Sequence, residues 1–288
     1  MLQLITMSTD NWYLDFLKSL LPKMEGLENS LSIIIQGPLN IRMKDSIPHY
    51  LKVIKNRQYF SKALSGNEFS KDKMLGNLII SCWENDDFSI IEEFKNNPNI
   101  KIIINKYSKL PKYEKRLGTR GASPWMFQNY TTKNGLSEAT GNLSIKVRSD
   151  EVYTNLEYFA KRMFLEYGKI FTSDIFFRRD AEEKFHISDH VIGGPTCTMK
   201  SAFQSAVHMC QNPYSEGVKF PEQLICRAFL KAKNEDLSKT YKSKEMMKRN
   251  FRIIPITKLG EITWTCSYRR YRPLKSQEDG WLQDINQI

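Results

Sequence analysis

The segment Ser144-Ile-Lys-Val-Arg-Ser-Asp150 joins a short apolar run to a cation, a hydroxyl and a carboxylate. The apolar run predicts a buried strand over residues 143–148. In open α/β sheets, ligands bind outside the carboxyl ends of the strands. We therefore predict that Arg148, Ser149 and Asp150 lie at a ligand-binding edge of a sheet.

The flanking sequence predicts strands that alternate with helices. Further strands are predicted at Ser32–Pro38, Leu78–Glu84, Ile100–Asn105 and Lys169–Ser173, and helices at residues 47–62, 88–94, 125–140, 155–167, 197–210 and 221–233. Such alternation is typical of right-handed βαβ units around a parallel sheet. The predicted fold is therefore α/β, with a mostly parallel central sheet of Rossmann type flanked by helices.

Composition and motifs give no indication of a membrane span, a disulfide framework, a dinucleotide-binding motif or a P-loop. The chain has 288 residues and an ordinary 41% of hydrophobic residues, and no stretch approaches the roughly 18 apolar residues of a membrane span. Its five cysteines are scattered without a C-x-x-C pair, which predicts reduced thiols in a cytosolic compartment. No G-x-G-x-x-G or Walker A motif follows the first strand. The formal charge of +11 favours an anionic partner, although a lysine-rich surface without function would give the same count.

We expect a single domain over residues 1–288, with a catalytic core at residues 31–235. Residues 1–30 form a predicted helical extension whose amphipathic stretch, residues 10–24, packs on the domain or docks on a membrane surface. Residues 236–288 form a helical and basic C-terminal elaboration, in which aromatic residues are interleaved with Lys and Arg. That tail could grip a diphosphate or nucleic acid, or be an ordinary solvated surface.

Several strand ends and loops carry candidate ligand-binding residues. Gln36-Gly37-Pro38 ends the first strand, where the backbone can approach a flat ligand or simply turn away. Glu84 ends the second strand, either on the ligand edge or at the surface. Lys133, on the helix at 125–140, could reach a phosphate, although a solvated lysine is the simpler interpretation.

The carboxylates suggest a metal and a general base. Asp150 is the best candidate for a Mg²⁺ or Mn²⁺ ligand, aided by Asp174, Asp189 or a histidine. Glu222 follows Pro221 at the start of a helix, where the dipole keeps a carboxylate ionised, so it is either a base or a helix-stabilising acid. Gly193 and Gly194 offer a backbone floor that a sugar could approach closely.

Seven segments, taken in order, resemble the WavE family of lipopolysaccharide-synthesis proteins over about residues 31–230. They are Ser32-Ile-Ile-Ile-Gln-Gly-Pro38, Ser81-Cys-Trp-Glu84, Gln128-Asn-Tyr-Thr-Thr-Lys-Asn-Gly-Leu136, Lys146-Val-Arg-Ser-Asp150, Phe171-Thr-Ser-Asp-Ile-Phe-Phe-Arg-Arg-Asp180, Phe185-His-Ile-Ser-Asp189 and Pro221-Glu-Gln223. The Lys-x-Arg-Ser-Asp and Ser-Asp-Ile-Phe-Phe segments are the most specific of them. The family is regarded as glycosyltransferase-like, which implies a GT-A nucleotide-sugar fold.

The resemblance also implies roles for individual residues. Asp150 would stand at the last acid of the Asp-x-Asp metal motif, with Arg148 in place of the first acid. Gln36 to Pro38 and Glu84 would line the nucleotide. Gly193-Gly194 would be an acceptor-side loop, with Asp174 on the same side, and Glu222 would be the base of an inverting enzyme.

The leading hypothesis is therefore a cytoplasmic glycosyltransferase, with peripheral contact to a membrane left open. It would move a sugar from a nucleotide-sugar donor to a glycan or lipid-linked acceptor, with inversion and with metal assistance. Glu222, or else Asp189, would deprotonate the acceptor. Two alternatives stay open: a metal-dependent nuclease built on Asp174 and Glu182-Glu-Lys184, and an inactive module that binds a nucleotide or glycan.

Overall fold

A computed structural model describes residues 30–65, 76–111, 123–175, 184–212, 218–260 and 262–264. Its main sheet has seven strands in the order β3-β2-β1-β4-β7-β6-β8. These strands are β1 (Leu31–Gln36), β2 (Leu78–Trp83), β3 (Ile100–Asn105), β4 (Leu143–Arg148), β6 (Ile170–Ser173), β7 (Ile192–Pro195) and β8 (Phe251–Ile254). In the described part of the main sheet only β7 pairs with its neighbours in antiparallel fashion, so the main sheet is mostly parallel.

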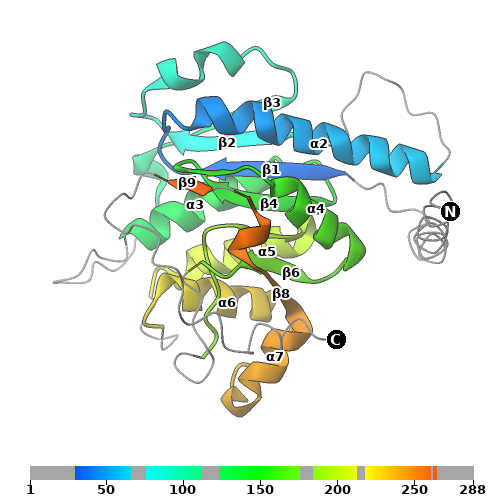
Figure 1. Cartoon of the computed structure of the whole chain (residues 1–288). Helices are drawn as coiled ribbons and strands as arrows, with labels where there is room; N and C mark the ends of the chain where they lie inside the picture. Colours follow the sequence, from blue (N-terminus) through cyan, green and yellow to red (C-terminus); the bar gives the residue numbers. More distant parts are fainter. Residues whose placement is uncertain are drawn as a thin grey trace, which may run out of the picture.

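The remaining elements flank this sheet (Figure 1). The helices are α2 (Met43–Ser65), α3 (Ser123–Ser137), α4 (Leu156–Leu165), α5 (Thr196–Met209), α6 (Pro221–Ala232) and α7 (Ser243–Asn250). Short 3₁₀ helices are η1 (Phe88–Phe94), η2 (Tyr107–Lys109), η3 (Thr240–Lys242) and η4 (Ile256–Lys258). A separate antiparallel pair joins β5 (Glu151–Tyr153) to β9 (Ile262–Trp264).

The central strands form because both faces of the sheet are covered. All six residues of β1 and of β2 are buried, as expected for parallel strands that bury apolar side chains on both sides. Alternate residues enter different cores: Ile33 and Ile35 pack with α2 and α4, whereas Ile34 packs with α3, α5 and α6. Figure 1 shows this layered arrangement, with α2 on one side of the sheet and α3, α5 and α6 on the other.

The predicted strands and most of the predicted helices are present. The bounds of β3 and β4 agree with those predicted, and α3 to α6 agree to within about three residues. The helix predicted at residues 88–94 is present and is a 3₁₀ helix. Strands β5, β7, β8 and β9 were not predicted, and the amphipathic stretch at residues 10–24 lies outside the described residues.

Strand β8 shows that the C-terminal segment is part of the main sheet. It pairs in parallel with β6 and is an edge strand of the main sheet, although it lies in the segment expected to be an extension beyond residue 235. Helix α7 likewise contributes Met246 and Met247 to the core. The segment after residue 235 therefore completes the sheet and its core.

Strand order also fixes where a ligand would bind. The chain runs from β1 outward through β2 to β3 and then returns to place β4 on the other side of β1. In open α/β sheets this reversal point, at the carboxyl ends of the strands, is the usual binding crevice. In the part of the chain that the structure describes, no helix is long and apolar enough to cross a membrane.

Candidate functional site

A pocket of about 490 Å³ opens at the carboxyl ends of β1 and β4. Six of the residues that sequence analysis selected line it together: Gln36, Gly37, Pro38, Arg148, Ser149 and Asp150. Residues of α3, including Phe127, Gln128 and Thr131, form the facing wall. The pocket therefore lies at the reversal point of the strand order, between β1 and β4.

Hydrogen bonds join the two strand ends beneath the pocket. The Ser149 N–H donates to the Gln36 carbonyl at 2.9 Å, and the Ser149 hydroxyl donates to the Pro38 carbonyl at 2.6 Å. Gly37 has a φ of +117°, and a Cβ there would lie 2.9 Å from the Ser149 hydroxyl oxygen. Glycine is required at this turn because a side chain would be strained and would push the β4 end away.

One wall of the pocket is aromatic. The Trp83 and Tyr107 rings stack at 4.5 Å with an interplanar angle of 9°, and Phe127 meets both rings edge-on. Trp83 is only 2% exposed, whereas Tyr107 is 42% exposed. Tyr107 therefore presents an aromatic surface of the kind on which flat heterocycles stack.

Amide side chains supply polar contacts at the same wall. The Thr131 hydroxyl oxygen lies 3.1 Å from the Gln36 side-chain oxygen, so the Gln36 amide packs against α3 at the pocket; the single hydroxyl proton also has the Phe127 carbonyl, at 2.9 Å, as an acceptor. Gln128 donates to the Asp189 carboxylate at 2.9 Å, so that Asp189 is one hydrogen bond behind the pocket wall. Fixed amides suit the recognition of a neutral polar ligand edge.

Arg148 and Asp150 are the two charged residues among the described residues that line the pocket. The guanidinium binds both carboxylate oxygens, with Nε at 2.9 Å from Oδ1 and Nη2 at 2.8 Å from Oδ2. Partial burial would raise the pKa of Asp150, but its hydrogen bonds from Arg148 and the Arg148 charge lower that pKa below its usual value. The two side chains therefore form a bidentate ion pair at the pocket rim.

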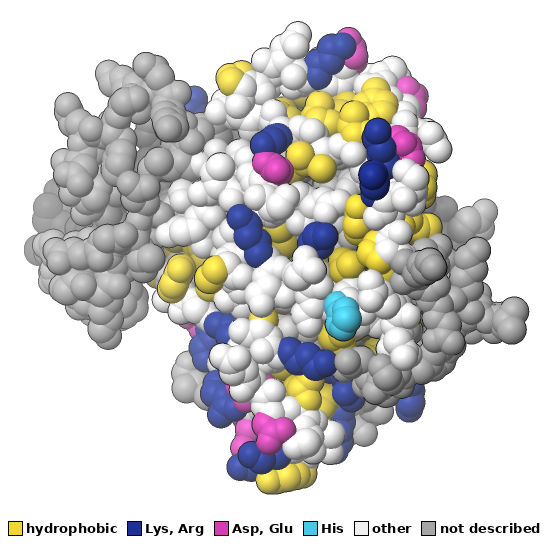
Figure 2. Space-filling view, turned by 180° about the vertical axis from the view of Figure 1, so that it is seen from behind, with side chains coloured by type: hydrophobic (Ala, Val, Ile, Leu, Met, Phe, Trp, Pro, Cys, Tyr) yellow, Lys and Arg dark blue, Asp and Glu magenta, His cyan; other side chains and the backbone are white. Residues whose placement is uncertain are grey.

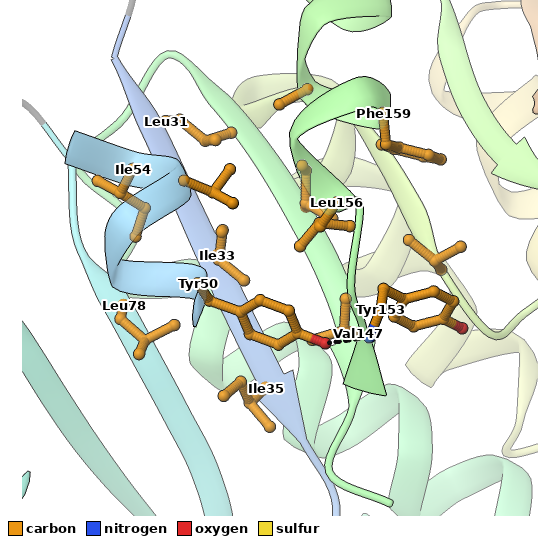
Figure 3. Close-up of a cluster of buried hydrophobic side chains, with 14 of the residues drawn as sticks. Leu31, Ile33, Ile35, Tyr50, Ile54, Leu78, Val147, Tyr153, Leu156 and Phe159 are labelled. Carbon is orange, nitrogen blue, oxygen red and sulfur yellow. Dashed lines mark hydrogen bonds between the residues drawn. The ribbon is translucent and has the colours of Figure 1, made fainter. Parts of the chain in front are cut away.

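A buried network around Glu151 lies beside the Arg148–Asp150 ion pair. Glu151 is 1% exposed, accepts a 2.6 Å hydrogen bond from the Tyr153 hydroxyl, contacts His190 Nδ1 and lies 3.2 Å from Arg148 Nε. Burial would raise the pKa of Glu151, but the His190 charge and hydrogen bond together with the Arg148 charge lower it. Figure 3 shows Tyr50 and Tyr153 in the adjoining core, where the Tyr153 N–H donates to the Tyr50 hydroxyl at 3.2 Å.

Lys146 is buried on β4 beneath the site. Its ammonium donates to the backbone carbonyls of Asp189 and, at 3.3 Å, of His190. Burial lowers the pKa of Lys146 to about 8. Burial alone would raise the pKa of Asp189, yet the charges of His190, Lys146 and Arg148 bring it to about 2. Asp189 is therefore held as a carboxylate inside the protein.

The donor set at Asp150 does not fit the divalent metal that was expected there. Both of its oxygens are bound by Arg148, and its neighbour Glu151 is directed to Tyr153 and His190. Across the described ranges, no group of three or more His, Cys, Asp or Glu residues is placed to hold a metal ion. Magnesium and manganese need open carboxylate oxygens.

Three other predicted residues do not line the pocket. Glu84 is exposed and accepts a hydrogen bond from the Tyr107 N–H at 2.9 Å. Lys133 lies over the Tyr130 ring, 5.4 Å from its centre. Glu222 is in the first turn of α6, 3.9 Å from His186 Nε2, in the position that stabilises a helix N-terminus.

The expected acceptor-side residues lie within the core. Gly193 and Gly194 belong to strand β7 and not to a loop, and a Cβ on Gly193 would lie 2.5 Å from Met163 Sδ. Asp174 is 3% exposed and accepts a hydrogen bond from the Ile256 N–H at 2.7 Å. These glycines make room for core side chains, which corrects the interpretation of them as a floor beneath a sugar.

Sequence reasoning missed Tyr107 and Phe127 of the aromatic wall and the buried acid Glu151. Tyr107 and Phe127 carry no motif, although Tyr107 follows the carboxyl end of β3 by two residues, where a ligand-edge residue is expected. Glu151 follows Asp150 directly, but strand β5 turns it inward toward His190, which lies 39 positions later in the chain.

Lys and Arg side chains are spread over the face opposite to that of Figure 1, with acidic side chains among them (Figure 2). Among the described residues of that face, the Lys and Arg side chains do not form a continuous basic stripe. Such a stripe is typical of nucleic-acid-binding proteins.

Comparison of the chain with protein-family models and with curated proteins finds no match.

Proposed function

We propose that this protein is a nucleotide-sugar-dependent glycosyltransferase of GT-A type, whose donor binds in the pocket between β1 and β4. The observation that carries the proposal is the meeting of an aromatic wall, fixed amides and an arginine at the reversal point of the strand order. A mostly parallel seven-stranded sheet with helices on both faces is compatible with that fold.

Each part of the pocket matches one part of a nucleotide-sugar. Tyr107 offers an open ring for stacking with a base, and Gln36 offers an amide for its polar edge. Arg148 offers a planar, permanently charged donor for the diphosphate. In sugar transfer the departing diphosphate gains negative charge, so a positioned cation stabilises the transition state more than the ground state.

The identity of the base stays a prediction. Asp189 is ionised, but its pKa of about 2 makes it a weak proton acceptor near neutral pH, where a base of higher pKa works better. Glu222 lies outside the pocket lining. Inversion with Glu222 as the base is therefore proposed on the WavE resemblance alone, and Asp189 is kept as the alternative base.

The test is a thermal-shift and donor-hydrolysis screen with UDP-, GDP-, CMP- and dTDP-sugars, each with and without Mn²⁺. We expect one nucleotide to stabilise the protein and Tyr107→Ala to weaken its binding. Loss of one base stack costs about 1–3 kcal/mol, or roughly five- to 150-fold in Kd.

Tyr241→Ala is the matched control, because Tyr241 is 75% exposed and does not line the pocket. Equal binding by both variants would remove the base-stacking role. A folded protein that ignores every donor but binds duplex DNA tightly would favour the nuclease alternative instead. Binding without any release of sugar would favour the inactive module. That alternative is also supported by the ion pair between Arg148 and Asp150, because Asp150 is the acid in the described pocket lining.

A further inference from the structure

Asp150 was expected to bind a metal, yet its geometry is that of a counter-ion. Its two oxygens face the Arg148 guanidinium in parallel hydrogen bonds of 2.9 and 2.8 Å. We infer that Asp150 holds Arg148 in place until the donor arrives, and that the diphosphate then replaces Asp150 on Arg148 without a divalent metal. This inference rests on the proposed function.

A metal at Asp150 would have to displace the guanidinium first. Mg²⁺ and Mn²⁺ bind carboxylate oxygens directly, and here both oxygens already accept charge-assisted hydrogen bonds. A dication in the same place would also lie beside the fixed positive charge of Arg148, which repels it. The pair therefore excludes a metal unless Arg148 moves away.

The neighbouring acids Glu151 and Asp189 do not provide further metal ligands. Glu151 is 1% exposed, and its two oxygens contact Tyr153 and His190. Asp189 is 6% exposed, bound by Gln128 and close to the Lys146 charge. Each of these carboxylates is committed to a partner inside the protein, so neither one can join Asp150 as a metal ligand.

Arg148 retains the donors that a diphosphate needs. A guanidinium has five N–H groups. Asp150 takes one from Nε and one from Nη2, so three donors, including both on Nη1, have no partner among the described residues. The side chain is 31% exposed at the pocket rim. Arginine binds carboxylate and phosphate with the same fork geometry, so one anion can replace the other.

Two explanations of Asp150 predict opposite effects of removing its charge. If Asp150 is a metal ligand, Asp150→Asn weakens metal-dependent nucleotide binding. If Asp150 is the counter-ion that the diphosphate must displace, Asp150→Asn leaves the buried Glu151, 3.2 Å from Nε, as the one acid beside Arg148 among the described residues, and tightens binding. Asparagine has nearly the same shape, so the substitution changes the charge and little else.

The experiment measures the Kd of UDP, GDP, dTDP, CMP and inorganic pyrophosphate by calorimetry, in EDTA and in Mn²⁺. We expect the Kd to change less than about twofold between EDTA and Mn²⁺. Asp150→Asn should lower the Kd about two- to fivefold, the effect of one partly exposed ion pair. Arg148→Gln should abolish binding in both conditions, and its melting temperature without ligand reports whether it folds.

Glu93→Gln is the control for net charge, since Glu93 is an exposed acid on η1 outside the pocket lining. It should leave the Kd unchanged. Binding that requires Mn²⁺, or weaker binding by Asp150→Asn, would overturn the counter-ion role while the proposed function stands. Failure of the folded wild-type protein to bind any probe in either condition would instead overturn the proposed function.

Discussion

Individual acids near the sheet edge differ in the direction of their pKa shifts because their surroundings differ. Asp150, Glu151 and Asp189 each have a cationic neighbour, and their pKa values fall despite burial. Asp174 has a backbone N–H as its hydrogen-bond donor, and burial raises its pKa to about 6. Burial decides the direction of a pKa shift where no positive charge opposes it.

Asp174 should therefore make stability depend on pH. Its pKa in the folded protein exceeds the ordinary value near 3.9, so the folded state holds the proton to higher pH than the unfolded state does. The free energy of unfolding should fall as the pH rises from about 4 to about 6, and Asp174→Asn should remove that fall. At pH 7 the variant should be more stable by up to about 3 kcal/mol.

Urea unfolding from pH 4 to pH 8 measures this difference. The asparagine side-chain oxygen of the variant can still accept the hydrogen bond from the Ile256 N–H, so this contact is kept in the comparison. Asp45→Asn, at an exposed position in the first turn of α2, is the control and should retain the wild-type slope. An identical slope in Asp174→Asn would show that another group titrates in this range.

Strand β7 shows what glycine contributes inside an element. Ile192-Gly-Gly-Pro195 runs antiparallel between β4 and β6 and closes the gap between the two parts of the sheet. Gly193 faces Met163 and Phe159 of the α4 side, and Gly194 faces Ile170. The missing side chains let helix and strand pack at close range.

Gly193→Ala should consequently destabilise the fold. The added methyl group would lie 2.5 Å from Met163 Sδ and 2.8 Å from a Phe159 ring carbon, so core side chains must shift. Overpacking of this kind costs about 1–3 kcal/mol, which urea unfolding would measure. Ser201→Ala, at an exposed position on α5, should change the free energy of unfolding by less than about 0.5 kcal/mol.

The same variant separates two roles for Gly193. A core role predicts lower stability with unchanged UDP or GDP affinity, because the residue does not line the pocket. If sugar transfer were lost while stability stayed at the wild-type value, Gly193 would belong to an acceptor site after all.

The folded unit depends on the C-terminal part of the described chain. Strand β8 pairs only with β6 at the edge of the described sheet, and Phe251 packs on Phe229 of α6 with ring centres 6.3 Å apart. Strand β9 pairs with β5, directly after Asp150, so that the C-terminal segment also borders the site.

A chain that ends after residue 235 should therefore fail to fold cooperatively. It would lose β8, β9 and the buried side chains of Met246, Met247 and Phe251. Near-ultraviolet circular dichroism and urea unfolding would detect this, with a chain that ends after residue 264 for comparison, since it keeps every described element. A cooperative transition in the shorter chain would mean that residues 31–235 are a domain by themselves.

Six of the fourteen residues that line the pocket were predictable from strand ends. Gln36, Gly37 and Pro38 lie at the carboxyl end of β1, and Arg148, Ser149 and Asp150 lie at that of β4. Carboxyl ends of parallel strands meet at one edge, so adjacent strands bring these residues together without further information. Tyr107, Phe127 and Thr131 were not predictable, because the docking of α3 and η2 on that edge depends on packing.

Local pattern was enough for the α/β class, the bounds of β3 and β4, and the position of the ligand edge. Those features follow from apolar periodicity and turn residues, which act over a few neighbouring positions. Tertiary structure decided that Asp150 binds Arg148, that Glu151 turns inward to His190, and that Gly193 lies in the core. Each of these contacts joins residues that are brought together only when the sheet assembles. Their geometry is therefore not encoded by the neighbouring sequence.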